Sequence, residues 1–263
     1  MSCRGMGIAR KRLHRLALLA LVVMGCQTVP VTGRSQLVLL PEREEMELGL
    51  RAYQEVLSKS KLSANPQITA QVERVGQRIA AATGRSDLRW EFKSIEDEKN
   101  RNAFALPGGK VAVYTGILSL TRDDTGLAVV LGHEVAHAVA RHGAERMSQG
   151  LLAQLGLAAV MVSMRDRDPK TVQTVGALLG AGAALGVILP YSRLQESEAD
   201  HLGLIYMAKA GYDPRAAVEF WQRMEQAARG GAPPQFLSTH PSHETRTRQI
   251  EQWIPEALTH YRP

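Results

Sequence analysis

The residues best suited to chemistry form the segment His133-Glu134-Val135-Ala136-His137. Histidines four positions apart lie on the same face of a helix, about one turn apart, so both imidazole rings can bind one ion. Neutral imidazole suits zinc, and zinc lowers the pKa of a bound water to about 7. Glu134 can take a proton from that water and pass it to a leaving amine. The pattern therefore predicts one Zn²⁺ per chain, held by His133 and His137.

The residues around this motif favour a buried site over a surface helix that merely carries two histidines. The stretch GLAVVLGHEVAHAVA is apolar on all sides, so the polar side chains within it should be buried. Buried polar groups need partners, and a metal ion supplies them. We expect the helix to begin at Asp123-Asp124, which can cap it, and to continue to about Ser148.

A hydrolytic zinc site needs a third protein ligand. His142 lies about 140° from His137 around a continuous helix, so we do not expect it at the zinc. In the acidic segment QESEADHLG, Glu196 and Asp200 are four apart and share a helix face. Glu196 can then bind zinc while Asp200 accepts a hydrogen bond from a ligand histidine. Glu198 is the alternative ligand, but its spacing gives it no comparable partner.

The first 25 residues have the three parts of an export signal. A basic stretch precedes the apolar run LALLALVVM, which is shorter than the roughly 20 residues that span a bilayer. The following Gly25-Cys26 completes a bacterial lipobox-like sequence, which predicts a signal peptide over residues 1–25 and a lipid on Cys26. The alternative is an ordinary secretory signal with an incidental cysteine. Residues 26–41 are then a lipidated tether that docks onto the domain and anchors it to a membrane.

Most of the net positive charge lies in this leader. Residues 1–25 hold five of the 32 basic side chains and no acidic one, which leaves 27 basic against 26 acidic side chains, a net charge of +1. The charge of the remaining chain therefore gives no support to a nucleic-acid partner. No pattern indicates a particular oligomeric state.

Several segments together resemble the M48 family of zinc metallopeptidases, and in particular its periplasmic lipoprotein branch. They are PVTGRSQL, NAFALPGG, HEVAHAVARHG, ESEADHLG and STHP. The resemblance implies an α+β, mostly helical, zincin-like domain over residues 42–263, with a small edge sheet beside the HExxH helix. It also implies a zinc endopeptidase that cleaves misfolded or unassembled envelope polypeptides on the periplasmic side of a bacterial envelope. Gln27 favours the outer membrane.

The resemblance also assigns roles outside the zinc ligands. The strand that follows NAFALPGG forms the edge of the cleft and pairs with extended substrate, which implicates Asn102, Ala103, Phe104, Val111 and Val113. In STHP, His240 is placed to occupy the open coordination position and hold the enzyme latent, with Arg246 near by as an oxyanion or substrate contact. The alternative is that His240 only caps a loop at a helix entry.

Two alternatives stay open at this point. A zinc-stabilised chaperone or binding module would share the metal site, although a purely structural site has no need of a general base such as Glu134. The apolar stretches within residues 151–189 are marginal for a bilayer. We expect them to form a helical hairpin packed on the core, with a plug over the active site as the alternative.

Overall fold

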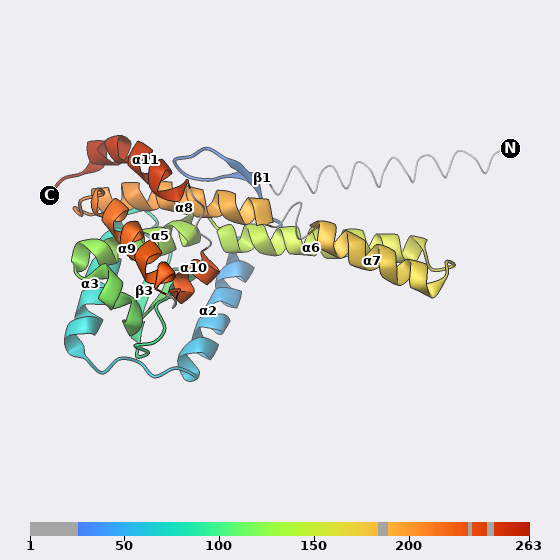
Figure 1. Ribbon diagram of the computed structural model, residues 1–263, viewed down its shortest axis with the longest axis horizontal. Coiled ribbons are helices and arrows are strands. Elements are labelled where there is room, and N and C mark those ends of the chain that lie inside the picture. Colours follow the sequence, from blue (N-terminus) through green and yellow to red (C-terminus); the bar gives the residue numbers. More distant parts are fainter. Residues whose placement is uncertain (1–25, 184–188, 231–232, 241–244) are drawn as a thin grey trace.

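A computed structural model describes residues 26–183, 189–230, 233–240 and 245–263, with the backbone alone described for 181–183 and 189–192. It shows a domain of helices around a small sheet, from which a helical hairpin projects (Figure 1). The strands are β1 (Cys26–Thr28), β2 (Ser35–Leu37), β3 (Glu91–Ile95), β4 (Ala103–Leu106) and β5 (Lys110–Tyr114). The helices are α2 (Glu42–Ser58), α3 (Pro66–Ala82), η1 (Thr115–Ile117), α4 (Leu118–Thr121), α5 (Asp124–Val139), α6 (His142–Ser163), α7 (Pro169–Ala183), α8 (Leu189–Lys209), α9 (Ala216–Arg229), α10 (Gln235–Thr239) and α11 (Arg246–His260). The predicted mostly helical α+β fold is confirmed.

The three-stranded sheet has the order β3-β5-β4, with β5 parallel to β3 and antiparallel to β4. The prediction that Val111 and Val113 lie in the edge strand is therefore wrong. Both are fully buried in the central strand, and the outer strands are β3 and β4, of which β4 packs beside α5. The chain forms β4 first and then returns through the turn at Pro107–Gly109 to fill the position between β4 and β3.

Helix α5 is buried on nearly all sides, as its apolar sequence predicts, and it crosses α8 at two glycines. A Cβ atom added to Gly203 would lie 2.9 Å from the backbone nitrogen of His133, and one added to Gly132 would lie 2.8 Å from the carbonyl oxygen of Gly203. Only glycine permits so close an approach of two helix backbones. The crossing brings the acidic residues of α8 against the motif on α5.

The predicted helix from Asp123 to about Ser148 is interrupted. Arg141 adopts a left-handed conformation (φ 56°, ψ 34°), and α6 begins in a new direction at His142. The Arg141 guanidinium stabilises this break by donating hydrogen bonds to Glu45 at 2.7 Å and to the carbonyl of Leu40 at 3.2 Å. The periodicity of one continuous helix therefore misplaces the residues that follow the motif.

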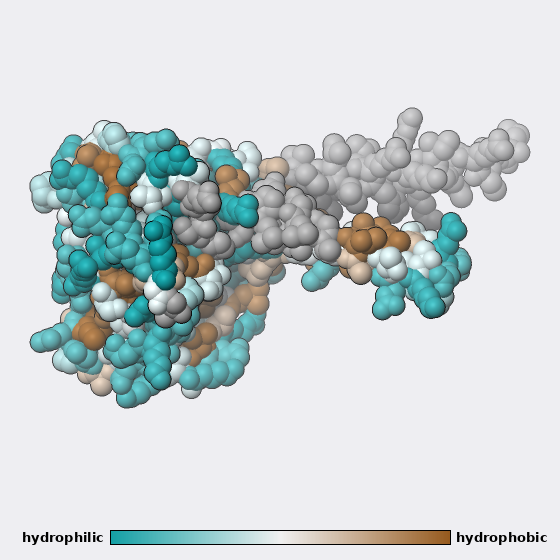
Figure 2. Space-filling model, viewed as in Figure 1, coloured by the Kyte–Doolittle hydropathy of each residue, from teal (hydrophilic) through white to brown (hydrophobic). Residues whose placement is uncertain are grey.

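The α6–α7 hairpin does not pack on the core as predicted; it extends away from the domain and carries apolar surface (Figures 1 and 2). Its exposed large side chains include Leu151, Leu152, Leu155, Val162, Leu178 and Leu179. Within the described residues, no helix is both long enough and apolar enough to span a membrane.

The segment that follows Cys26 docks on the domain. Strands β1 and β2 pair as an antiparallel hairpin, and Val29 and Val38 are buried. The Gln36 amide donates to the carbonyl of Ala140 at 2.9 Å, and the backbone N–H of Leu39 donates to Ser148 Oγ at 2.9 Å. This segment thus packs beside the start of α6, next to the helix that carries the motif.

Candidate active site

Four buried side chains converge on one point: His133 and His137 from α5, Glu196 from α8, and His240 directly after α10. One nitrogen or oxygen atom from each lies within 4.8 Å of those of the other three. The Nε2 atoms of His133 and His137 are 3.1 Å apart, and each lies 3.3 Å from an oxygen of Glu196. The structure thus brings together the two predicted histidines, the favoured third ligand and the predicted latch.

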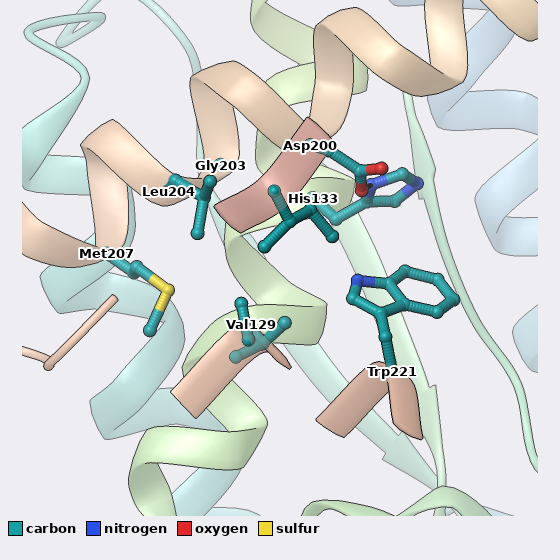
Figure 3. A pocket seen from close by; sticks show the side chains of 9 residues that line it. Val129, His133, Asp200, Gly203, Leu204, Met207 and Trp221 are labelled. Carbon is teal, nitrogen blue, oxygen red and sulfur yellow. Dashed lines mark hydrogen bonds and ion pairs between the residues drawn. The ribbon is translucent and has the colours of Figure 1, made fainter. Parts of the chain in front are cut away.

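The second nitrogen of His133 is held by Asp200. Its Nδ1 lies 2.9 Å from Asp200 Oδ1, and Figure 3 shows this carboxylate against the imidazole ring, with Trp221 close by. Arg246 donates to both oxygens of Asp200, at 2.7 and 2.8 Å, and stacks over the Trp221 ring at 3.5 Å. Burial opposes the charge of Asp200, but Arg246 and His133 outweigh it and hold the pKa of this carboxyl below its ordinary value. Arg246 is 1% exposed, so its guanidinium faces Asp200 within the protein interior.

The second nitrogen of His137 is held by residues that the spacing argument did not find. His137 Nδ1 lies 2.8 Å from Nδ1 of His142, whose Nε2 lies 3.1 Å from Glu198 Oε2. His142 is not in the metal-facing cluster, as expected, but the break at Arg141 brings it beside His137. Glu198, predicted to have no partner, is 6% exposed and bound to His142. The sequence motif contained Glu198, but nothing in it indicated the left-handed conformation of Arg141, which places His142 beside Glu198.

Glu134 is 1% exposed and faces the same cluster. The backbone N–H of Ala105 in β4 is close enough to its carboxylate to favour the charged form, and its Oε1 lies 3.3 Å from His240 Nε2. Burial raises the pKa of Glu134 to about 8, against the opposing pull of a charged His133. A carboxyl group with a pKa near neutrality is suited to accepting and returning a proton.

The arrangement fits a metal cation. Glu134 Oε1 and Glu196 Oε2 are buried with no hydrogen-bond partner among the residues that the structure describes. The Nδ1 atoms of both motif histidines are engaged elsewhere, so their Nε2 atoms are left pointing toward Glu196. Two imidazoles and a carboxylate are the donor set of many hydrolytic zinc sites.

The predicted substrate residues divide between two strands. Ala103 and Phe104 lie in the edge strand β4, Asn102 directly precedes it, and Val111 and Val113 lie in the central strand. Cys26, the predicted lipidation site, is exposed in β1, and the signal peptide predicted over residues 1–25 lies outside the described residues.

A buried HExxH helix, a carboxylate from a second helix and a neighbouring edge strand define a metallopeptidase of the zincin kind. The model of Peptidase family M48 matches residues 66–254, and the chain belongs to this family. The family and the relatives below support a metalloendopeptidase.

Named relatives cover most of this chain. It is 41% identical over 236 residues to the mitochondrial metalloendopeptidase OMA1 of Schizosaccharomyces pombe, an alignment that covers 87% of this chain and 66% of that protein. It is 35% identical over 244 residues to the human mitochondrial metalloendopeptidase OMA1, which covers 87% and 46%. It is 28% identical over 225 residues to the beta-barrel assembly-enhancing protease of Escherichia coli K12, which covers 83% and 45%. The chain thus spans about half to two thirds of these relatives.

These comparisons correct the predicted location. Relatives that share 30–41% identity, from two yeasts, cattle and human, are mitochondrial by name, whereas two bacterial relatives share 28–29%. The predicted location on the periplasmic side of a bacterial envelope, with the outer membrane favoured, is therefore wrong. The M48 family is confirmed, but its periplasmic lipoprotein branch is not specifically supported.

Proposed function

We propose that this chain hydrolyses peptide bonds with a zinc ion bound by His133, His137 and Glu196, with Glu134 as general base and His240 as a latch. The observation that carries the proposal is the convergence of these side chains at one buried point, with Glu134 and His240 facing each other at 3.3 Å. A zinc ion at this site supplies Lewis-acid activation of water and of the scissile carbonyl.

Glu134 then performs the proton transfers. As a carboxylate it accepts a proton from the attacking water, and as a carboxylic acid it returns the proton to the leaving amine. In the metal-free chain burial raises the pKa of Glu134 to about 8, and a cation bound beside it would lower that pKa and favour the carboxylate that the first step needs. Arg246 acts through Asp200, since its two hydrogen bonds fix the carboxylate that orients His133. This assigns Arg246 a positioning role in place of the direct substrate contact that the resemblance implied.

The edge strand β4 is suited to binding a substrate in extended form. The backbone N–H of Tyr114 donates to the carbonyl of Asn102, so these two residues form a hydrogen-bonded pair of the antiparallel ladder. The next pair along the strands, Ala103 and Val113, is then a non-hydrogen-bonded pair. By this alternation the backbone groups of Ala103 and Ala105 point outward from the sheet, and the Ala105 N–H reaches Glu134. A peptide that pairs with this edge would run past the general base.

A groove beside β4 supports the same reading. Its volume is about 420 Å³, and Ala105, Leu106, Leu48 and Met147 are among the residues that line it. An apolar groove next to a backbone-pairing edge suits unfolded or unassembled polypeptides, whose chains are extended and whose apolar side chains are accessible. We therefore propose such polypeptides as the substrate class.

Digestion of an unfolded protein such as casein tests this function. The wild-type chain should cleave it, and Glu134→Gln should reduce cleavage by about 10²–10⁴-fold because the variant keeps the shape of the side chain and loses the base. A zinc chelator should abolish cleavage and added Zn²⁺ should restore it. A wild-type chain that binds zinc fully and cleaves nothing would favour the alternative, a zinc-stabilised chaperone module.

His240→Ala distinguishes a latch from a catalytic contact. His240 is 8% exposed and lies among the zinc-binding atoms, where it can exclude water and substrate. If it is a latch, its removal should raise the cleavage rate. Lower activity at unchanged zinc content would show that His240 assists catalysis instead. Lipidation of Cys26, and the division into a leader, a tether and a domain over residues 42–263, stay predictions.

A further inference from the structure

A chain of hydrogen bonds runs from His137 to the N-terminal hairpin. His137 meets His142 at 2.8 Å, and His142 meets Glu198 at 3.1 Å. Glu198 in turn accepts from Arg34 at 2.8 Å. His142 is fully buried, Glu198 is 6% exposed, and the Arg34 side chain is 16% exposed. Three segments that are far apart in the sequence, the N-terminal hairpin, the α5–α6 junction and α8, thus join in one line that ends at the metal-facing histidine.

The chemistry of these groups sets the direction of each hydrogen bond. The Glu198 carboxylate only accepts, so the Nε2–H of His142 donates to it. A neutral His142 then has a lone pair at Nδ1, and the partner that donates to it is the Nδ1–H of His137. The proton of His137 is therefore on Nδ1, which leaves the Nε2 lone pair directed toward Glu196 and His133.

We propose that His142, Glu198 and Arg34 are positioning residues that fix the tautomer and ring orientation of His137 for metal binding. The inference deepens the proposed zinc site and rests on it. It makes the β1–β2 segment part of the metal centre. A similar arrangement exists at His133, where Asp200 accepts from Nδ1 and Arg246 holds Asp200 in place.

Further contacts at Arg34 hold this series of hydrogen bonds in place. Its guanidinium also donates to both oxygens of Glu145 in α6, at 2.8 and 2.9 Å, and the hydroxyl of Thr32 donates to Glu198. Glu198 therefore accepts from three side chains: His142 of α6, and Thr32 and Arg34 of the β1–β2 hairpin. A carboxylate held from three directions can orient an imidazole with little freedom.

The test is the affinity of the full-length chain for Zn²⁺, measured by competition with a chromophoric chelator. His142→Ala should weaken binding by about 10–100-fold, as the loss of such a partner commonly does. His142→Gln should recover part of the loss, because its amide can accept from His137 and donate to Glu198. Arg34→Ala should weaken binding less, and the double variant with His142→Ala should be no weaker than His142→Ala alone, since both changes break one chain.

Arg85→Ala is the matched control. Like Arg34, Arg85 is a partly buried arginine that donates to two carboxylates, Glu42 at 2.6 Å and Asp87 at 2.9 and 2.7 Å, but the structure records no contact between it and His142 or Glu198. Its Zn²⁺ affinity should stay within about twofold of wild type. The visible absorption spectrum of the Co²⁺-substituted chain should change for His142→Ala and not for Arg85→Ala, because only the former alters the geometry of a ligand.

The results separate the two proposals. A wild-type chain that binds no Zn²⁺ overturns the proposed function and this inference with it. If wild type binds Zn²⁺ but no more tightly than His142→Ala, the positioning role alone is overturned. An equal loss of affinity for Arg85→Ala and Arg34→Ala overturns it as well. If circular dichroism shows that His142→Ala does not fold, Arg34→Ala and His142→Gln decide the matter by the same criteria.

Discussion

Two pairs of apolar-rich helices in this molecule have opposite surroundings. The α5–α8 pair is enclosed, crosses at Gly132 and Gly203 with near backbone contact, and surrounds a set of ionisable side chains. The α6–α7 pair projects from the domain, and several of its leucines are exposed (Figures 1 and 2). The difference shows that apolar content alone does not assign a helix to the core. In the first pair, close backbone packing and hydrogen-bond partners for most of the buried polar groups make enclosure possible.

The largest expected effect concerns the ionisation of carboxyl groups, which is costly inside the α5–α8 pair and not on the exposed α6–α7 hairpin. In the metal-free protein, the pKa of Glu134 is raised by burial to about 8 in the folded state, against about 4.5 when unfolded. Between these pH values the folded chain keeps a proton that the unfolded chain has lost, so the free energy of unfolding falls as pH rises. Relative to Glu134→Gln, the free energy of unfolding of wild type should fall over this pH range by at most about 5 kcal/mol, since each pKa unit corresponds to about 1.4 kcal/mol.

Urea unfolding of both metal-free proteins between pH 4 and pH 9 measures this effect. The two curves should meet near pH 4 and separate as pH rises to 8. Asp168 in the α6–α7 hairpin is the control: Thr171 lowers its pKa through hydrogen bonds at an exposed position, so Asp168→Asn should show no such divergence. Parallel curves for Glu134→Gln and wild type would mean that Glu134 is solvated.

The next difference concerns glycine. Gly203→Ala would place a methyl group 2.9 Å from the backbone of Gly132 and His133, so the helices must move apart at a cost of about 3 kcal/mol or more. Gly156→Ala in α6 meets nothing within 4 Å and should stabilise the helix by up to about 1 kcal/mol. Thermal unfolding of the two variants should therefore shift in opposite directions. A tolerated Gly203→Ala would show that the crossing is looser than described.

The smallest effects belong to the exposed face of the hairpin. Leu155 is 57% and Leu178 is 67% exposed, so their replacement by glutamine should change stability by no more than about 0.5 kcal/mol. Leu202→Ala in α8, where the side chain is fully buried, should cost about 2–5 kcal/mol. Chemical denaturation measures all three. A loss above about 2 kcal/mol at Leu155 or Leu178 would show that this face is covered in the isolated protein.

The same contrast explains which parts of the site were predictable. Within one helix, 3.6-residue periodicity places side chains reliably, so His133 could be paired with His137, and Glu196 with Asp200, from spacing. The need of a zinc site for a third ligand then joined the two pairs. His142 and Glu198 could not be paired, because their meeting depends on the left-handed Arg141 and on two helices that bring together residues 56 positions apart. The edge strand was misassigned because spatial order in the sheet does not follow chain order. The helical hairpin was predicted, but its projection from the domain was not, because periodicity reports an apolar face and not what covers it.

The central claim is that His133, His137 and Glu196 hold one zinc ion, with Glu134 beside it. X-ray absorption spectroscopy at the zinc edge, combined with metal analysis of the purified full-length chain, tests this most directly. The account predicts one Zn²⁺ per chain with nitrogen and oxygen ligands at about 2.0–2.2 Å, and loss of the metal in His133→Ala and Glu196→Ala. A wild-type chain without zinc, or zinc retained at full occupancy in both variants, would contradict it.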